Sequence, residues 1–538
     1  MSGALLQLSS IGLQDVFLNS NPEISLFKKE YKRYTNFATL TQIINFDGNN
    51  INFGETRTAT IDNNGDLIYK IVLVLKLKEN TEKEWGYVNK LGHAIINNIK
   101  VTIGGTEIDN HFGDWIDIYN ELYKNASHDN NYNKMIGNIP EMKRIDHNHD
   151  EYTLYIPLYF WCSKASFLTF PTCALKNQDF QLSVTLNSAI DCINYKQNNI
   201  PTNIPEIVSS YFLVDYIYLD LMERELFKKD VHYYLIENLQ EMTDTIESQT
   251  NRYPLTFDHP SKYIIWASNL NRYYERNKFL AFGFDDDFEK ARNNFAKLIW
   301  LCSRDGLNMD SNPTIVIDST FINIGESPKL ISNGNNIIEK MINKVSAILL
   351  FTETVNDQIV ANATLENVVL ISNTITFEDM STTIDEMKND SLSTTEQNLF
   401  LDYYTLNIKD IFNYGNFINR TDNPIVRSQL LLNGREKFQE IDGNFFNNMI
   451  PYHYFDNKPS DGINVYNFCI KPKDVKTSGT IHFGKINDNK ELIIKMGKNN
   501  LITNNYFTNY FKSGRIRIFS YNYSLLTISP NLNTITLT

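Results

Sequence analysis

Residues 428–438 read SQLLLNGREKF, and residues 100–108 read KVTIGGTEI. Each stretch has two apolar-rich runs around a central Asn-Gly or Gly-Gly pair, which readily takes the positive φ that a two-residue turn needs. Both stretches therefore predict a β-hairpin. One hairpin lies in each half of the chain, and a repeat of half the chain is too long for a solenoid period. The pattern indicates that a whole β domain is duplicated.

The segments after the two hairpins also match. Trp115, Ile118, Tyr119 and Leu122 recur at i, i+3, i+4 and i+7, which predicts one short amphipathic helix after the first hairpin. The second hairpin leads into an aromatic-rich segment with helical potential, residues 444–450. Each half then closes on an aromatic strand, YIYL in the first half and FSYNY in the second.

The rest of the chain is rich in strand patterns. Aromatic and β-branched residues suit pleated, half-buried surfaces, and 33 Phe and 30 Tyr bring the aromatic fraction to 13%. The predicted strands of the first half are 36–46, 58–61, 67–77, 94–103, 106–108, 152–160, 180–186 and 211–221. Those of the second half are 263–268, 314–318, 346–352, 365–377, 425–432, 464–470, 480–483 and 515–526. We predict an all-β protein with short helices and long polar loops.

The charge and the cysteines limit the kinds of partner and compartment. The formal net charge of −13 disfavours direct binding of nucleic acid, which works by replacing counterions with Lys and Arg. The five cysteines are widely spaced and odd in number, so we expect reduced thiols in a cytosolic product rather than a disulfide framework. They are Cys162, Cys173, Cys192, Cys302 and Cys469. The best apolar run, residues 71–77, is far shorter than a membrane helix, so we expect a soluble protein that is not embedded in a membrane.

Candidate chemical sites are few. The cluster from Asp146 to Asp150 holds His147 and His149, but no third ligand follows at a useful spacing, so a solvated polar loop is favoured over a metal site. Residues 285–287 are three aspartates that suit a helix start better than a calcium loop. Gly104-Gly105 is not followed by the helix start of a phosphate-binding loop.

Motifs of catalysis and of modification point the same way. No G-x-S-x-G, H-E-x-x-H or paired CxxC motif occurs, so we predict no catalytic, cofactor-binding or metal-binding residues, no cofactor and no enzyme activity. Five N-x-S/T sequons are expected to stay unglycosylated, because the modification depends on secretion. They begin at Asn125, Asn362, Asn389, Asn419 and Asn522.

Several sequence blocks resemble one viral family. In chain order they are GALLQL (3–8), QDVFL (14–18), NPEISLF (21–27), YKRYTNFA (31–38), YIPLYFWC (155–162), VDYIYLD (214–220), LNG (432–434), PYH (451–453), GINVYNF (462–468) and YNY (521–523). Together they strongly resemble the major capsid proteins of nucleo-cytoplasmic large DNA viruses. The sequence departs most from that family between about residues 270 and 420.

The resemblance implies two consecutive eight-stranded jelly-roll barrels with short helices and long loops inserted. The implied domains are an N-terminal arm (1–25), a first jelly roll (26–222), an inter-barrel linker (223–255) and a second jelly roll (256–538) with long surface insertions at about 270–420. The arm is expected to lie beneath the capsomer and to be ordered by its neighbours. The charged, helix-compatible residues 220–229 mark the boundary between the barrels.

The resemblance also implies a function and partners. Homotrimers with a pseudo-sixfold outline would tile the icosahedral shell of a large DNA virus over an internal membrane. The partners would be neighbouring capsomers, minor capsid proteins and penton proteins. The chain would be located in the virion, after assembly in the host cytoplasm. The alternatives are a related double-barrel assembly scaffold or a minor capsid paralogue. A carbohydrate-binding jelly-roll protein is a less favoured alternative.

Overall fold

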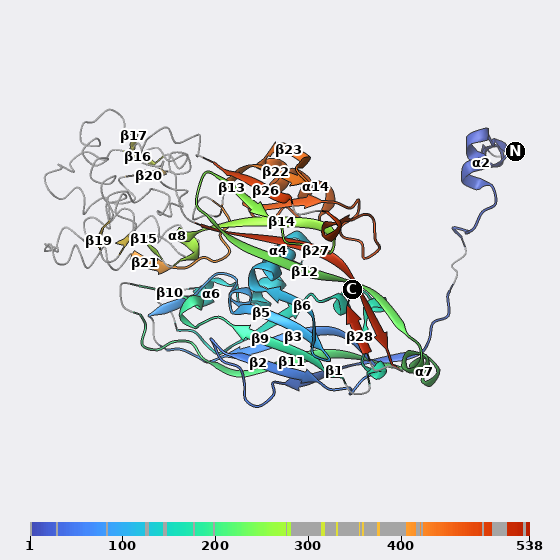
Figure 1. The fold of residues 1–538 in the computed structure, drawn as a ribbon, viewed down its shortest axis with the longest axis horizontal. Coiled ribbons are helices and arrows are strands. Elements are labelled where there is room, and N and C mark those ends of the chain that lie inside the picture. The colour runs from blue at the N-terminus through green and yellow to red at the C-terminus, as the bar shows by residue number, and fades with distance from the viewer. Residues whose placement is uncertain are drawn as a thin grey trace.

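The computed structural model is an all-β molecule with short helices. The residues that the structure describes are 3–27, 31–81, 84–123, 128–143, 148–175, 178–196, 200–275, 277–280, 314–317, 330–331, 354–355, 358–359, 374–376, 405–415, 420, 423–486, 489–497, 514–530 and 534–537. Figure 1 shows two stacked β barrels, with helix α4 between them.

The first barrel consists of two sheets with the strand orders β1-β11-β3-β7 and β2-β9-β5-β6. The strands are β1 Phe37–Asn45, β2 Thr56–Ile61, β3 Leu67–Leu77, β5 Ile96–Ile103, β6 Thr106–Phe112, β7 Tyr152–Leu158, β9 Phe180–Leu186 and β11 Ile207–Leu219. Strand β9 shows why the sheets enclose a core: Phe180, Leu182, Val184 and Leu186 are buried, and the residues between them face outward.

The second barrel repeats this arrangement with the strand orders β12-β27-β14-β24 and β13-β26-β22-β23. Its strands are β12 His232–Ile246, β13 Thr250–Pro254, β14 Pro260–Leu270, β22 Ile425–Leu432, β23 Arg435–Asp442, β24 Ile463–Asn467, β26 Lys490–Met496 and β27 Gly514–Ser529. Inside this barrel the buried Trp266 donates its indole N–H to the Oγ of Ser428 over 3.2 Å. Each barrel therefore has eight strands in the same order, and the predicted double jelly roll is confirmed.

Two further features join the halves of the chain. One sheet has the order β15-β21-β10-β4, so β10 of the first half pairs with β21 of the second. These strands are β4 Trp85–Tyr87, β10 Ile193–Lys196, β15 Asn277–Leu280 and β21 Thr405–Ile408. The long strand β27 extends beyond its own barrel, because Leu526 and Ile528 near its end belong to the core of the first barrel. There β28 (Thr534–Leu537) pairs with β27.

The remaining elements are short. The helices are α1 Gly3–Ser9, α2 Leu13–Asn19, α3 Leu91–Ala94, α4 Gly113–Tyr123, α5 Asp129–Met135, α6 Pro140–Lys143, α7 Leu221–Lys229, α8 Asn271–Tyr274 and α14 Ile450–Tyr454, the π-helix η7 Phe445–Met449, and the 3₁₀ turns η2 Trp161–Ser163, η3 Ser166–Leu168, η4 Thr172–Ala174, η5 Ile190–Cys192 and η8 Phe483–Lys485. The other strands are β8 Phe170–Pro171, β16 Thr314–Ile317, β17 Leu330–Ile331, β18 Thr354–Val355, β19 Gln358–Ile359, β20 Thr374–Thr376 and β25 Ile481–His482.

The predicted linker over residues 223–255 differs from the structure. Most of helix α7 lies in it, and β12 and β13 follow, which are both strands of the second barrel. The sequence pattern hid β12 because Glu237 and Glu241 break the apolar alternation. Both carboxylates are paired with buried or partly buried cations, which only the tertiary structure brings near.

The insertion expected at about 270–420 falls between β14 and β22. The predicted strand 346–352 lies outside the described residues, as does most of 365–377, in which β20 is described.

Candidate functional site

Helix α4 joins the two barrels through an apolar stripe. Trp115, Ile118 and Leu122 are spaced so that they share one helix face, and all three are buried against the second barrel. The ring of Trp115 lies 5.5 Å from that of Phe519 and 5.3 Å from that of Tyr521, both on β27. The helix therefore belongs to the first barrel by chain position and covers the outer face of the β12-β27-β14-β24 sheet.

A charged contact lies at the start of the same helix. Asp114 accepts a hydrogen bond from Arg515 over 2.8 Å and a second from Arg517. Arg517 also reaches Glu241 on β12, with its Nη2 2.9 Å from the Glu241 Oε1. Because these four groups lie at the joint and are largely buried, their pairing fixes α4 against two strands of the second barrel.

The other carboxylates of α4 form a second charged cluster. Asp117 lies 2.8 Å from the Nζ of Lys90 and 3.0 Å from the Nδ1 of His93. Burial alone would raise the pKa of Asp117, but Lys90 and His93 hold this pKa at about 2. Glu121 also binds Lys90, and it accepts the backbone N–H of Ser460 in the second barrel over 2.6 Å.

A third cluster centres on Glu237 of β12. Its carboxylate lies 2.7 Å from the Nζ of Lys164, which belongs to the first barrel, and also binds Lys262 of β14. Burial raises the pKa of Glu237, but the two lysines outweigh it, and the net pKa is lowered. The Lys164 ammonium also sits 4.3 Å from the centre of the Tyr521 ring. The barrels are thus joined by apolar contacts and by three charge clusters.

The lowered pKa of Asp117 predicts acid sensitivity. Its pKa falls from 3.8 to about 2 on folding, so its stabilising effect is present above the unfolded pKa and is lost as the pH falls through the folded pKa. We expect a thermal midpoint that is steady above about pH 5 and drops below about pH 4. Differential scanning fluorimetry across this range tests it. The variant Asp117→Asn should have a lower thermal midpoint than the wild type at neutral pH. Its midpoint should fall by less than that of the wild type when the pH is lowered. An equal acid-induced drop in both proteins would contradict this role of Asp117.

The structure places one residue of the candidate metal cluster, His149, in a core, whereas Asp150 is exposed, as expected for a polar loop. His149 is buried, stacks on Trp85 and makes a 3.0 Å hydrogen bond from its Nε2 to the carbonyl oxygen of Trp85. The expectation of a solvated loop is therefore wrong for His149, because its ring packs against Trp85 and Tyr87, which belong to the core of the first barrel. Asp146 and His147 lie outside the described residues. Within the described ranges, no group of three His, Cys, Asp or Glu side chains could hold a metal ion.

Other predicted features are placed as follows. Gly104 and Gly105 have φ of 56° and 83° and form the predicted hairpin turn. Asn522 is fully buried in β27, so its sequon is closed to modification in the folded chain. The sequons at Asn125, Asn362, Asn389 and Asn419 lie outside the described residues, as do residues 285–287 and Cys302.

The described cysteines are free thiols, and three of the four are buried. Burial raises the pKa of Cys162 to about 12, which makes a reactive thiolate unfavourable at neutral pH. No helix among the described residues is long and apolar enough to cross a membrane.

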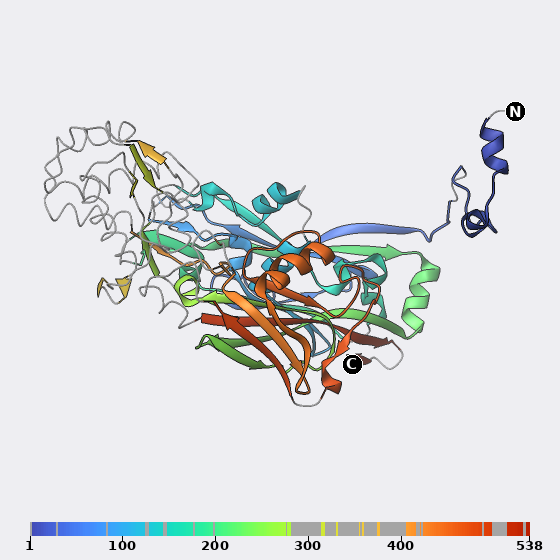
Figure 2. The same ribbon diagram turned by 90° about the horizontal axis from the view of Figure 1, so that it is seen from above.

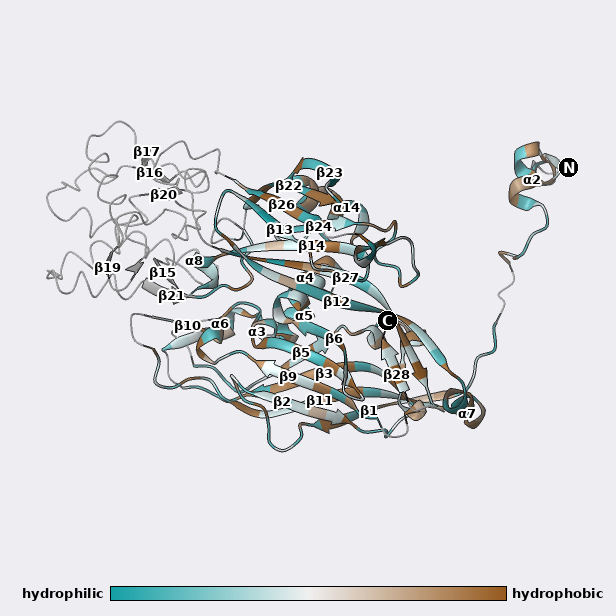
Figure 3. Ribbon diagram, in the orientation of Figure 1, coloured by the Kyte–Doolittle hydropathy of each residue, from teal (hydrophilic) through white to brown (hydrophobic). Residues whose placement is uncertain are grey.

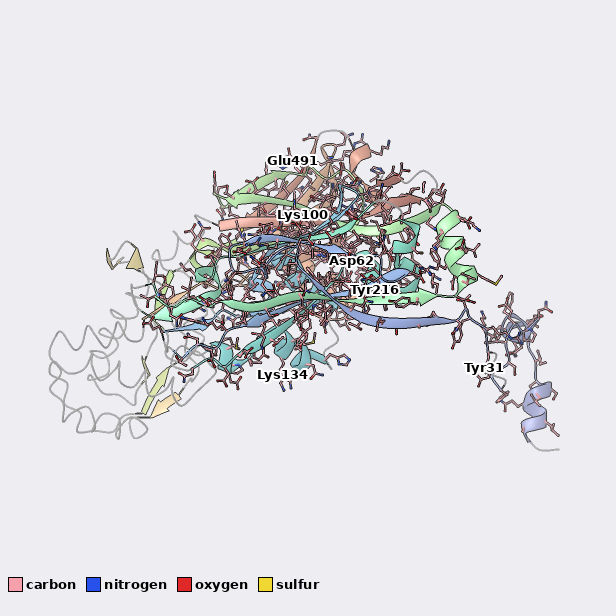
Figure 4. The ribbon with its side chains drawn as sticks, turned by 90° about the horizontal axis from the view of Figure 1, so that it is seen from below. Tyr31, Asp62, Lys100, Lys134, Tyr216 and Glu491 are labelled. Carbon is pink, nitrogen blue, oxygen red and sulfur yellow. The ribbon has the colours of Figure 1, made fainter. Side chains whose placement is uncertain are left out.

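One uncovered apolar surface is the N-terminal arm. Helices α1 and α2 project away from both barrels, as Figure 2 shows, and Tyr31 lies on the chain that leads out to them (Figure 4). The arm exposes large apolar side chains: Phe17 is 94% exposed and Leu18 81%. Parts of its ribbon carry the hydrophobic colour in Figure 3. A helix without a covering surface gains little from burial, so such an arm needs a neighbour.

Two more uncovered surfaces lie on the barrels. A groove of about 710 Å³ runs along η7 and α14. Its lining residues are Asp442, Asn444, Phe445, Asn448, Met449, Tyr452 and Lys458. The second surface is the outer face of the β1-β11-β3-β7 sheet, where Ile43 is 60% exposed and Tyr155 39%. Sequence reasoning missed both surfaces, because the same apolar residues suit a barrel core.

Comparisons with known proteins agree over nearly the whole chain. The family model "Major capsid protein N-terminus" matches residues 25–220, and "Large eukaryotic DNA virus major capsid protein" matches residues 223–534. Capsid protein 1 of Acanthamoeba polyphaga mimivirus is 29% identical over 98% of this chain and 98% of its own length. Probable capsid protein 4 of the same virus is 25% identical over 99% of this chain and 98% of its own length.

A solved structure shows the same fold. A chain of the PBCV-1 virus capsid superposes with a TM-score of 0.61 at 21% identity, over 96% of this chain and 99% of that one. The chain belongs to the family of large eukaryotic DNA virus major capsid proteins, and it is a structural component of the viral capsid.

Proposed function

We propose that this chain forms a homotrimer in which six jelly rolls surround one axis, and that such trimers tile the icosahedral shell of a large DNA virus. The observation that carries the proposal is the repetition of one barrel, strand for strand, within a single chain. Two like barrels held at a fixed angle supply two of six similar positions, so three copies complete a pseudo-hexagonal tile.

The buried joint supports this role. A tile must keep its two barrels in one orientation while many neighbours press on it, and α4 with its charge clusters provides that rigidity. Each contact between tiles can then be weak, because the shell repeats it many times.

The exposed arm, residues 1–25 in the predicted division, supports a contact beneath the tile. We propose that neighbouring capsomers and minor capsid and penton proteins cover it. The shell would overlie an internal membrane, with the chain itself not embedded. Assembly would take place in the host cytoplasm. Its net charge of −13 argues against direct contact with the genome, and the role proposed here involves no catalysis and no cofactor.

The oligomeric state of the purified full-length chain tests the proposal. Size-exclusion chromatography with light scattering should give a mass of three times the chain mass of 62.4 kDa. Negative-stain images of the same fraction should show a hexagonal outline. A chain that stays monomeric even at high protein concentration, with no larger species, would overturn the proposed trimer.

A second candidate is a capsid paralogue present in few copies. It is favoured by one observation: two of the relatives, capsid protein 1 and probable capsid protein 4, come from the same virus. Quantitative mass spectrometry of purified virions separates the two readings. A dominant shell protein should be the most abundant capsid species by mole, whereas a paralogue should be far below another member of the family.

A further inference from the structure

The two barrels carry equivalent helices after equivalent hairpins. Strands β5 and β22 are both eight residues long and begin at Ile96 and Ile425. Gly113 follows β6 and Gly443 follows β23, and a Cβ on either glycine would collide with the carbonyl oxygen of that isoleucine. The same close approach therefore fixes where each helix starts. It aligns α4 of the first barrel with η7 and α14 of the second.

Counting from these glycines matches the helix faces residue by residue. Trp115 corresponds to Phe445, and Leu122 corresponds to Tyr452. On α4 this face is buried in the joint, with Trp115 only 1% exposed. On η7 and α14 the same face lines the open groove, and Tyr452 is 81% exposed. Among the residues that the structure describes, the face of one copy of the helix is covered by the other barrel, and the matching face of the other copy is left open.

The face that receives α4 is also repeated. It is the outer face of the β12-β27-β14-β24 sheet, where Phe519 pairs with Ile265. Strands β3 and β14 both have eleven residues, so matching their ends sets Val72 at the place of Ile265. Val72 pairs with Leu213, which thus takes the place of Phe519. This face of the first barrel carries apolar residues such as Ile43, Val72 and Leu213 beside the polar Thr41, Lys76 and Asp215, and it is only partly covered by the described residues. The exposed face of an antiparallel sheet is ordinarily polar, so the apolar part of this face is notable.

The edge strands of the two barrels show the same correspondence as the helices and the sheet faces. In the joint, β6 at the edge of one barrel meets β12 at the edge of the other, and Asp109 accepts the backbone N–H of Leu239 over 3.0 Å. The equivalent strands are β23 and β1, which are both terminal in their sheets as the structure describes them. Uncovered edges of eight and nine residues are sites where a second chain can pair.

We infer that the η7–α14 groove of one copy docks on the outer face of the β1-β11-β3-β7 sheet of the next copy. The inference rests on the proposed trimer and names its contact surfaces. The two faces differ, so the contact is head to tail, and the ring closes when the third copy meets the first. Asn444 stands at the place of Asp114, so the contact between copies does not repeat that carboxylate's ion pairs with Arg515 and Arg517.

Charge-introducing variants of the full chain test the pairing. The double variant Met449→Glu/Tyr452→Glu places carboxylates in the groove, and Ile43→Glu places one on the receiving sheet. All three side chains are at least half exposed, so the monomer should fold normally, which its thermal midpoint checks. Ile470→Glu is the control, because Ile470 is 74% exposed and lies outside both faces. Light scattering should give monomers for the groove and sheet variants, and trimers for the wild type and the control.

A photo-crosslinking residue at position 452 adds a second readout. Mass spectrometry should find links to residues of β1, β11, β3 or β7 in another copy. Trimers that survive both the groove and the sheet variant, or links to a different surface, would overturn this pairing and leave the trimer standing. A wild-type chain that stays monomeric would instead overturn the trimer, and the pairing with it.

Discussion

Replacing Arg517 with methionine is expected to destabilise the chain by about 3–5 kcal/mol, because it leaves buried carboxylates without their cation. Asp114 and Glu241 both depend on this guanidinium, whose side chain is 9% exposed. Arg515 would still pair with Asp114 in this variant. Among the described residues, no ion pair joins Arg515 to Glu241, so Glu241 would lose its cation. The loss should appear as a lower midpoint in urea and thermal unfolding.

A matched control separates this effect from the loss of any arginine. Arg427 pairs with Glu440 on the surface, with 58% of its side chain exposed, so Arg427→Met should cost no more than about 1 kcal/mol. Equal midpoints for the Arg517 and Arg427 variants would show that the cluster at the joint contributes little. A smaller loss in the variant Arg517→Met/Asp114→Asn/Glu241→Gln would support unpaired charge as the cause.

Truncating Trp115 to alanine is expected to cost about 3–5 kcal/mol, since it removes a large buried ring and leaves a cavity. The ring contacts both Phe519 and Tyr521, so the damage falls on the joint and not on either barrel core. We therefore expect the two barrels to unfold less cooperatively, with two thermal transitions where the wild type has one.

The conservative variant Trp115→Phe should recover part of the loss, because it keeps an aromatic ring in place. Phe167→Ala is the control. Because Phe167 is 64% exposed, this substitution should change the free energy of unfolding by less than about 0.5 kcal/mol. A single transition at the wild-type midpoint in Trp115→Ala would mean that the barrels are held together by other contacts.

The sequence predicts the strands best where burial alternates along them. Strand β9 was predicted with its observed bounds, because its buried residues alternate with partly exposed ones. The two hairpins and the helix with Trp115 also follow from local pattern. Such features depend on residues close together in the chain, so the sequence alone is sufficient to find them.

The features that were missed depend on distant residues. Strand β12 carries Glu237 and Glu241, which suit a strand only because Lys164 and Arg517 come to them from elsewhere in the fold. His149 looked like part of a polar loop, but it is buried against Trp85 of another segment. The open groove was not predicted either, because the sequence pattern alone does not distinguish whether Phe445 and Tyr452 face a barrel core or an open surface.

A cryo-electron microscopy reconstruction of the purified full-length chain tests the central claim most directly. We predict a ring of three copies and six barrels, in which η7 and α14 of each copy lie on the β1-β11-β3-β7 sheet of the next. Density for Tyr452 should be buried between two copies, close to β11 or β3. A reconstruction of monomers, or of trimers whose groove faces solvent, would contradict the account.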